Sequence, residues 1–132
     1  MFSDADFFIR KGVEYVNAQL FDKALNCFNN AIELEPKNRY GWQSKGFMLC
    51  NMNRWQEAAL CFDRMIELDP RNPEPWAWKG DALLGMQMYP EAIACFNQAI
   101  DLDQDWDFPL QAKQFALEQQ NRRSCSNPTP NK

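Results

Sequence analysis

A repeat of 34 residues constrains this chain more than any other feature of its sequence. Seven columns keep one residue type at this step in three consecutive units, and five of them carry the argument here. They are Lys11, Lys45 and Lys79; Gly12, Gly46 and Gly80; Ala24, Ala58 and Ala92; Phe28, Phe62 and Phe96; and Ile32, Ile66 and Ile100. A fixed period of this length is typical of repeat proteins, in which each unit packs mainly against its neighbours. The sequence therefore predicts three equivalent units.

Each unit has the pattern of two helices. In the first unit Phe8, Gly12 and Tyr15 are three or four residues apart, which puts them on one face of a first helix. A polar break follows at residues 17–19, and a second apolar stripe runs over residues 24–32. One hairpin cannot bury both of its faces, so the units are expected to stack. The expected fold class is all-α.

Small residues and prolines mark the ends and contacts of these helices. Only small side chains let two helices approach to about 8–10 Å, so we expect Gly12 to face Ala24 across the hairpin. Pro36 and Pro70 follow the second helices and are expected to end them, because proline has no N–H and clashes with the preceding turn. The third unit has Gln104 at this position.

The units resemble the tetratricopeptide repeat, whose signature is Trp-x-x-Leu-Gly-x-x-Tyr, then Ala-x-x-x-Phe, then Pro. The matching residues are Phe8, Lys11, Gly12, Tyr15, Ala24, Phe28 and Pro36 in the first unit, Trp42, Lys45, Gly46, Leu49, Ala58, Phe62 and Pro70 in the second, and Trp76, Lys79, Gly80, Leu83, Ala92 and Phe96 in the third. Lysine replaces the signature leucine each time. The resemblance implies a right-handed superhelical solenoid of three helical hairpins, with Trp42, Trp76 and the repeated phenylalanines in its core.

The repeat pattern also sets the expected domain boundaries. The units fall at about residues 5–38, 39–72 and 73–106. One more first-helix pattern follows at about 107–121 without a partner helix, which indicates a capping helix over the last apolar face. The repeat domain is thus expected to cover residues 1–121, and the polar, proline-bearing tail 122–132 to be disordered.

Composition excludes several classes of partner. The net charge of -4 comes without a basic stripe, which disfavours nucleic acid. No stretch approaches the roughly 20 apolar residues that cross a bilayer, so no membrane association is expected. The N-terminus is acidic and lacks the layout of a signal peptide, and the five cysteines form no paired framework. We expect a cytoplasmic protein.

The candidate binding residues lie in columns that change between units. In the family that the chain resembles, the first helix of each unit lines a concave face. The candidate peptide-binding residues there are Ile9, Arg10, Val13, Tyr40, Phe47, Glu74, Trp78, Asp81 and Phe115. Their aromatic members are of the type that concentrates binding energy, and their acidic members favour a partner with apolar anchors and a mild basic bias. An exposed aromatic can equally pack on a neighbouring repeat, which is the alternative for Trp78.

Two specific sites are disfavoured. Some relatives bind the carboxylate tails of heat-shock chaperones through groove lysines and asparagines. In the corresponding columns this chain has Ile9, Val13, Ser44, Glu74 and Trp78, which cannot supply the cationic donors. The 34-residue column Cys27, Cys61 and Cys95 is best explained as small buried thiols, because equivalent stacked helices lie too far apart for a disulfide.

Three classes of function remain to be weighed. The chain has no histidine and no glycine-rich phosphate loop, so we expect no enzyme, cofactor or metal. The leading hypothesis is a protein–protein interaction module, an adaptor or scaffold that binds a peptide or helix of a partner protein in the concave groove. The alternative is a self-associating structural or assembly-factor protein, possible as a homo-oligomer, without a peptide ligand.

Overall fold

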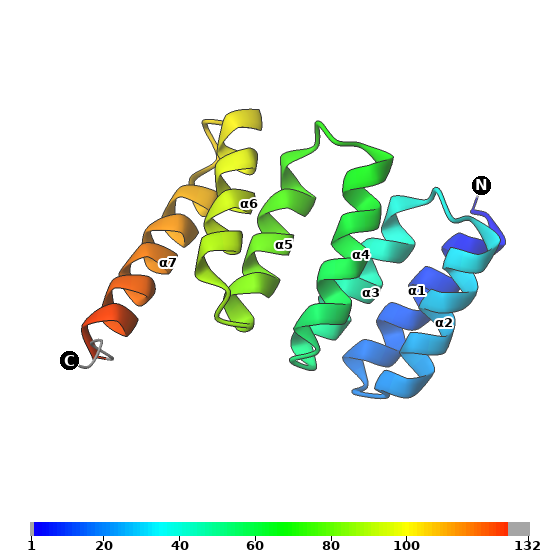
Figure 1. Cartoon of the computed structure of the whole chain (residues 1–132). Coiled ribbons are helices and arrows are strands. Elements are labelled where there is room, and N and C mark those ends of the chain that lie inside the picture. The colour runs from blue at the N-terminus through cyan, green and yellow to red at the C-terminus, as the bar shows by residue number, and fades with distance from the viewer. Residues whose placement is uncertain (1, 127–132) are drawn as a thin grey trace. The chain divides into compact units, whose positions relative to one another are not determined.

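A computed structural model describes residues 2–126. The regular secondary structure in that range is entirely helical. The seven helices are α1 (Asp4–Asn17), α2 (Phe21–Leu34), α3 (Arg39–Asn51), α4 (Trp55–Leu68), α5 (Pro73–Gly85), α6 (Tyr89–Leu102) and α7 (Asp107–Ser126), as labelled in Figure 1. The predicted all-α class and the predicted helical hairpins are confirmed. The chain divides into two compact units, Met1–Pro70 with α1 to α4 and Arg71–Lys132 with α5 to α7, which are described separately below.

Each unit is built from helical hairpins around buried phenylalanines. In the first unit α1 packs along α2 and α3 along α4, while α3 also contacts both α1 and α2. In the second unit α5 packs along α6, and α7 packs on α6 and contacts α5. The repeated residues Phe28, Phe62 and Phe96 are almost completely buried, as expected. The repeated phenylalanine column therefore lies in the core of each hairpin.

The glycine column exists to make room for these phenylalanine rings. A Cβ atom added to Gly46 would lie 2.6 Å from Cε1 of Phe62, and one added to Gly80 would lie 2.6 Å from Cε1 of Phe96. Phe28 meets Gly12 in the same way. The nearest side chain to each of these glycines is thus a phenylalanine, a partner that the expectation of Gly12 facing Ala24 did not name.

The tryptophan column is less deeply buried than the repeat pattern predicts. Trp42 and Trp76 are both half-buried. The indole Nε1–H of Trp42 donates a hydrogen bond to the carbonyl of Pro36 at 2.8 Å, so Trp42 fastens the loop between α2 and α3 to its own helix. Trp76 packs on the edge of the cluster that includes Leu83 and Phe96. A half-buried tryptophan can pack its apolar ring against the protein while its N–H bonds a polar partner near the surface.

The turn inside each hairpin uses a left-handed residue. Gln19, Asn53 and Gln87 have φ values of 61°, 58° and 59°. In the first hairpin the N–H of Leu20 donates to the carbonyl of Tyr15 at 2.8 Å and that of Gln19 to Val16 at 2.9 Å, the paired bonds of a Schellman motif. The sequence shows only a polar break at these positions, because the usual glycine is absent.

The second helices end at the same column with or without proline. α2, α4 and α6 end at Leu34, Leu68 and Leu102, although the third unit lacks the proline. In that unit the backbone N–H of Asp103 donates to the carbonyl of Ala99, and the Asp103 side chain accepts a bond from the N–H of Asp105 at 3.1 Å. An aspartate that bonds the backbone two residues on forms a turn of its own, so Asp103 ends α6 in place of proline.

The last helix is longer than predicted. α7 continues to Ser126, past the expected end at residue 121. Arg123 Nη1 donates a hydrogen bond to the carbonyl of Gln87 at 3.3 Å and so ties this part of α7 to the turn between α5 and α6. The boundary of the expected tail therefore lies later in the chain, and residues 127–132 of that tail lie outside the described residues. α7 also has the exposed Gln114 where the other first helices have glycine.

Candidate protein-binding site

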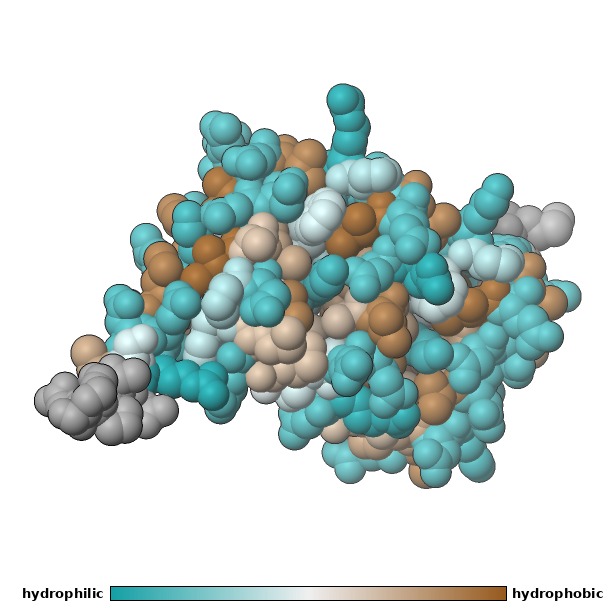
Figure 2. All heavy atoms as spheres, viewed as in Figure 1, coloured by the Kyte–Doolittle hydropathy of each residue, from teal (hydrophilic) through white to brown (hydrophobic). Residues whose placement is uncertain are grey.

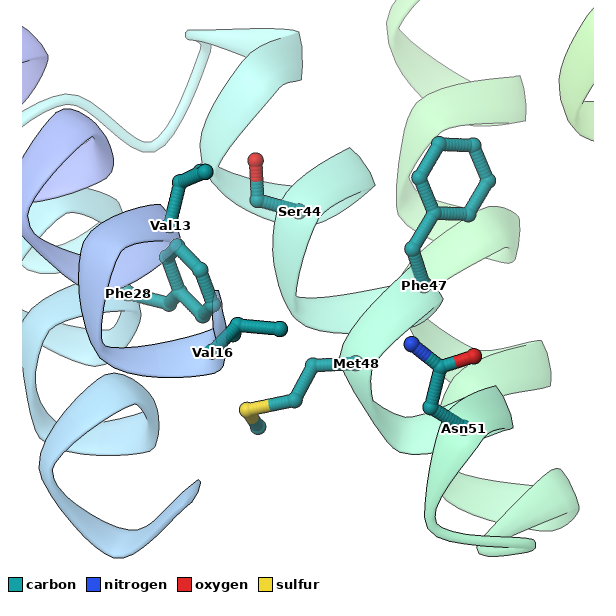
Figure 3. Close-up of a pocket in the computed structure, with 7 residues that line it drawn as sticks. All are labelled: Val13, Val16, Phe28, Ser44, Phe47, Met48 and Asn51. Carbon is teal, nitrogen blue, oxygen red and sulfur yellow. The ribbon is translucent and has the colours of Figure 1, made fainter. Parts of the chain in front are cut away.

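A small pocket opens between α1 and α3 in the first unit. Its volume is about 120 Å³, and it is lined by Val13, Val16, Phe28, Ser44, Phe47, Met48 and Asn51. Figure 3 shows that Val13 and Val16 of α1 lie on one side of the pocket, and that Ser44 and Met48 of α3 point toward them. Phe47 and Asn51 lie to the right of Ser44 and Met48 in this view, farther from Val13 and Val16. The pocket thus has two helical walls, each made by residues one turn apart.

The floor of the pocket is buried while its rim is open. Phe28 and Met48 are each only 1% exposed, whereas Val13 is 42% and Phe47 is 38% exposed. The Phe47 ring lies 6.0 Å from the ring of Phe62, which supports it from within its own hairpin. The buried floor residues belong to the core, so an apolar group that enters this pocket would contact the core directly.

The lining of the pocket carries no charge. Five of its seven residues are apolar, and the polar ones are Ser44 and Asn51. The hydroxyl can donate and accept hydrogen bonds, and so can the amide. Such a lining suits an uncharged apolar group with polar atoms beside it.

The other predicted residues of the first unit lie outside this lining. Ile9 is half-buried on α1. The guanidinium carbon of Arg10 lies 5.0 Å from the centre of the Phe2 ring, and that of Arg39 lies 5.3 Å from the centre of the exposed Tyr40 ring. Two of the seven lining residues, Val13 and Phe47, are therefore among the predicted binding residues. The other predicted residues of this unit, Ile9, Arg10 and Tyr40, do not line the pocket.

The four predicted residues of the second unit lie on two of its helices. Glu74, Trp78 and Asp81 are on α5, and Phe115 is on α7. Trp78 is half-buried and Phe115 is exposed, so neither is sealed in the core. Protein atoms that crowd the Asp81 carboxyl raise its pKa above the usual value, although the residue as a whole is exposed.

Sequence reasoning placed Ser44 in a groove column without naming it as a candidate, and it missed the other four lining residues. Val16 and Asn51 lie one helical turn beyond Val13 and Phe47, so helical spacing could have found them. Met48 follows Phe47 in a column that also changes between units, from Glu14 to Met48 to Ala82. Phe28 could not be found in this way, because a repeated core residue gives no sign that it also forms the floor of a pocket.

The cysteine column is structural. Cys27, Cys61 and Cys95 are buried, as the sequence predicted. Burial raises the pKa of the Cys61 thiol to about 11 and also raises that of Cys27. Within residues 2–126 no group of three or more histidine, cysteine, aspartate or glutamate side chains could hold a metal ion.

Other surface hollows are weaker candidates. One of about 570 Å³ lies at residues 35–38, in the loop between α2 and α3. Apolar side chains are scattered among hydrophilic ones over the face seen in Figure 2 and do not form one continuous patch there. Another, of about 360 Å³, is lined by Phe8 of α1 and by Asn30, Glu33 and Leu34 of α2, whereas the pocket between α1 and α3 is lined by residues of three helices.

The hairpins define an all-α repeat protein, and comparison with known families identifies the repeat. Residues 5–38 and residues 50–114 each match a family model described as tetratricopeptide repeat. Together these segments cover most of α1, α2 and α4 to α6, and the beginning of α7. The chain belongs to the tetratricopeptide repeat family, as its repeated residues indicated.

Curated relatives match only part of the chain. A peroxisomal targeting signal receptor of Komagataella phaffii is 39% identical over 51 residues, which are 39% of this chain and 9% of the receptor. An uncharacterized protein of Methanocaldococcus jannaschii is 42% identical over 50 residues, which are 38% of this chain and 58% of that protein. The chain thus spans a small part of the receptor and little more than half of the archaeal protein.

Solved structures share the fold at low sequence identity. The Sgt2 tetratricopeptide domain from Aspergillus fumigatus has a TM-score of 0.84 at 15% identity, covering 99% of this chain and 88% of that chain. The first tetratricopeptide domain of Spaghetti (RPAP3), bound to an HSP90 peptide, has a TM-score of 0.81 at 14% identity, covering 89% of this chain and 94% of that chain. Identities this low establish the fold alone. Among the described residues, no helix has the length and apolar character to cross a membrane.

Proposed function

We propose that this chain is a protein–protein interaction module that binds a segment of a partner protein and so acts as an adaptor or scaffold. The observation that carries the proposal is the uncharged pocket between α1 and α3, with the exposed apolar residues Val13 and Phe47 at its rim. Both residues lie in columns that vary between repeats, so the hairpin fold does not require them. Exposed apolar groups around a concave site are typical of binding surfaces.

The relatives support a peptide as the type of ligand. One structural neighbour is a tetratricopeptide domain bound to an HSP90 peptide, and one curated relative is a peroxisomal targeting signal receptor. The ligand of this chain is expected to differ from an acidic chaperone tail, because the pocket lining has no cation. We propose instead a partner segment with an apolar anchor and a mild basic bias, the latter because Glu74 and Asp81 belong to the proposed contact set.

The complete proposed contact set is wider than the pocket. It comprises Ile9, Arg10, Val13, Tyr40, Phe47, Glu74, Trp78, Asp81 and Phe115. Val13 and Phe47 are expected to carry most of the affinity, since a few well-packed apolar residues usually dominate a protein interface.

A displayed peptide library selected on the full chain tests this function. Affinities of the selected peptides are then measured for the wild type and for the double variant Val13→Ala/Phe47→Ala. We expect the double variant to bind about 10- to 100-fold more weakly, equivalent to about 1.4–2.8 kcal/mol. Its melting temperature should stay close to the wild-type value, because both side chains lie at the rim.

The matched control is Leu60→Ala, which removes an exposed apolar side chain of α4 that does not line the pocket. It should leave the affinity unchanged. Equal affinity for wild type and double variant, or a selection that yields no peptide binding at micromolar concentration, would overturn the proposal.

The second candidate function is self-association, and the surface of α7 favours it. Leu110, Phe115 and Leu117 on this helix are all exposed. Size-exclusion chromatography with light scattering separates the two functions, because a mass that stays monomeric from micromolar to millimolar concentration eliminates self-association. Catalysis is not part of the proposal, since the sequence contains no histidine.

A further inference from the structure

We infer that the pocket between α1 and α3 is selective for one branched aliphatic side chain, that of leucine, isoleucine or valine, in an extended segment of the partner protein. This inference rests on the proposed function and specifies the chemistry of its anchor. Three observations carry it: the volume of the pocket, the packing of its floor, and the spacing of its two polar residues.

The volume favours an aliphatic anchor. The pocket measures about 120 Å³. An apolar protein cavity of about 150 Å³ holds one benzene molecule, so the smaller volume here favours an aliphatic side chain over the ring of phenylalanine or tryptophan. A branched side chain of three or four carbon atoms fits it. Its lining supplies no ion to pair with a charged side chain, which excludes lysine, arginine, aspartate and glutamate as the anchor.

The floor cannot readily move aside for a larger group. Phe28 is held beneath α1, where the absent Cβ of Gly12 leaves just enough room for its ring. Met48 is the adaptable member of the lining, but it is 1% exposed and enclosed by its neighbours. Close-packed interiors resist rearrangement, so the size limit set by the floor persists when a ligand binds.

The two polar residues match the backbone of an extended segment. Ser44 and Asn51 both line the pocket and are seven residues apart on α3, which separates them by roughly 10 Å along the helix axis. An extended chain covers the same roughly 10 Å in three residues. Ser44 and Asn51 can therefore bond peptide groups on either side of one anchor residue, in a segment that runs along α3.

The test uses two small probes of known structure, N-acetyl-leucinamide and N-acetyl-tryptophanamide. Each is titrated into the full chain while the ¹³C methyl signals of Val13, Val16 and Met48 are followed by NMR. The leucine probe should shift these signals saturably at millimolar concentration, and the tryptophan probe should bind at least about 10-fold more weakly. In Ser44→Leu, whose added side chain fills the pocket, the response to the leucine probe should disappear.

Circular dichroism verifies that Ser44→Leu is folded, and Val13→Phe, which covers the pocket from α1, provides a second blocked variant. Equal affinity for the two probes, or a leucine response that persists in both blocked variants, would overturn the inference.

The experiments distinguish failure of the proposed function from failure of the proposed selectivity. Selected peptides whose affinity requires an aromatic anchor would uphold the function and refute the selectivity. Leucine binding without any peptide binding would uphold the selectivity and refute the function.

Discussion

Three residues in the hairpin turns hold a backbone conformation that only glycine adopts without cost. Gln19, Asn53 and Gln87 all have positive φ, and a left-handed residue other than glycine costs roughly 1–2 kcal/mol. Asparagine tolerates this conformation better than glutamine, because its short side chain can bond the local backbone. The three turns thus share one backbone geometry, and the backbone strain is expected to be smaller at Asn53 than at Gln19 and Gln87.

Replacement of the glutamines by glycine should therefore stabilise the protein. We expect Gln87→Gly and Gln19→Gly each to raise the free energy of unfolding by about 0.5–1 kcal/mol, measured by urea denaturation. Asn53→Gly provides the matched control and should gain less. A loss of stability in both glutamine variants would mean that the side chains make contacts worth more than the strain.

The buried thiols should be chemically inert in the folded protein. The pKa of Cys61 is raised to about 11, so at pH 8 almost none of it is the reactive thiolate, and the surrounding helices exclude reagents. We expect a disulfide reagent to modify the exposed Cys125 rapidly and Cys27, Cys61 and Cys95 only at the rate of unfolding. The denatured chain, in which all five react, calibrates the measurement.

The pairing of a first-helix glycine with a second-helix phenylalanine holds each hairpin together. Gly46→Ala would bring a methyl group to about 2.6 Å from the Phe62 ring, and overpacking of this kind costs about 1–3 kcal/mol. Gly85→Ala makes the same substitution at an exposed helical position and should stabilise by about 0.5–1 kcal/mol. Thermal unfolding of both variants checks the contrast, and destabilisation by Gly85→Ala of similar size would contradict it.

The sequence predicted the positions of helices that the repeated columns determine. It did not predict features that depend on a single residue. The 34-residue period predicted all seven helices, because the hydrophobic face of each hairpin is dictated by the same columns. The turn that Asp103 forms after α6 and the bond from Arg123 of α7 to the carbonyl of Gln87 each involve a residue outside the repeated columns. Nothing in a periodic pattern reveals such bonds. The half-burial of Trp42, which bonds Pro36, was missed for the same reason.

The candidate site was predicted less completely than the fold. Variable columns drew attention to Val13 and Phe47, which both line the pocket, since a residue that the shared geometry does not fix is available for a ligand. The floor of the pocket comes from Phe28 and Met48, whose burial depends on how α1, α2 and α3 meet in space. That information is a property of tertiary packing and cannot be read from one column at a time.

At the scale of the whole molecule, α7 shields the apolar face of α6. Pro109, Ala112 and Ala116 of α7 are buried. A chain that ends at residue 106 should lose roughly 2–4 kcal/mol of stability through the exposed contact surface and should aggregate on heating. Thermal unfolding monitored with light scattering provides the measurement. A chain that ends at Ser126 keeps every contact described here and is the control, so equal melting temperatures for the two truncations would contradict the capping role.

The glutamine at position 114 has a consequence for any attempt to lengthen the array. A further second helix laid against α7 would bring its phenylalanine to the place that Gln114 occupies, where the three preceding hairpins have no side chain at all. An engineered fourth repeat would therefore require Gln114→Gly before its partner helix could seat. Gln114 thus distinguishes α7 from the first helices of the three hairpins.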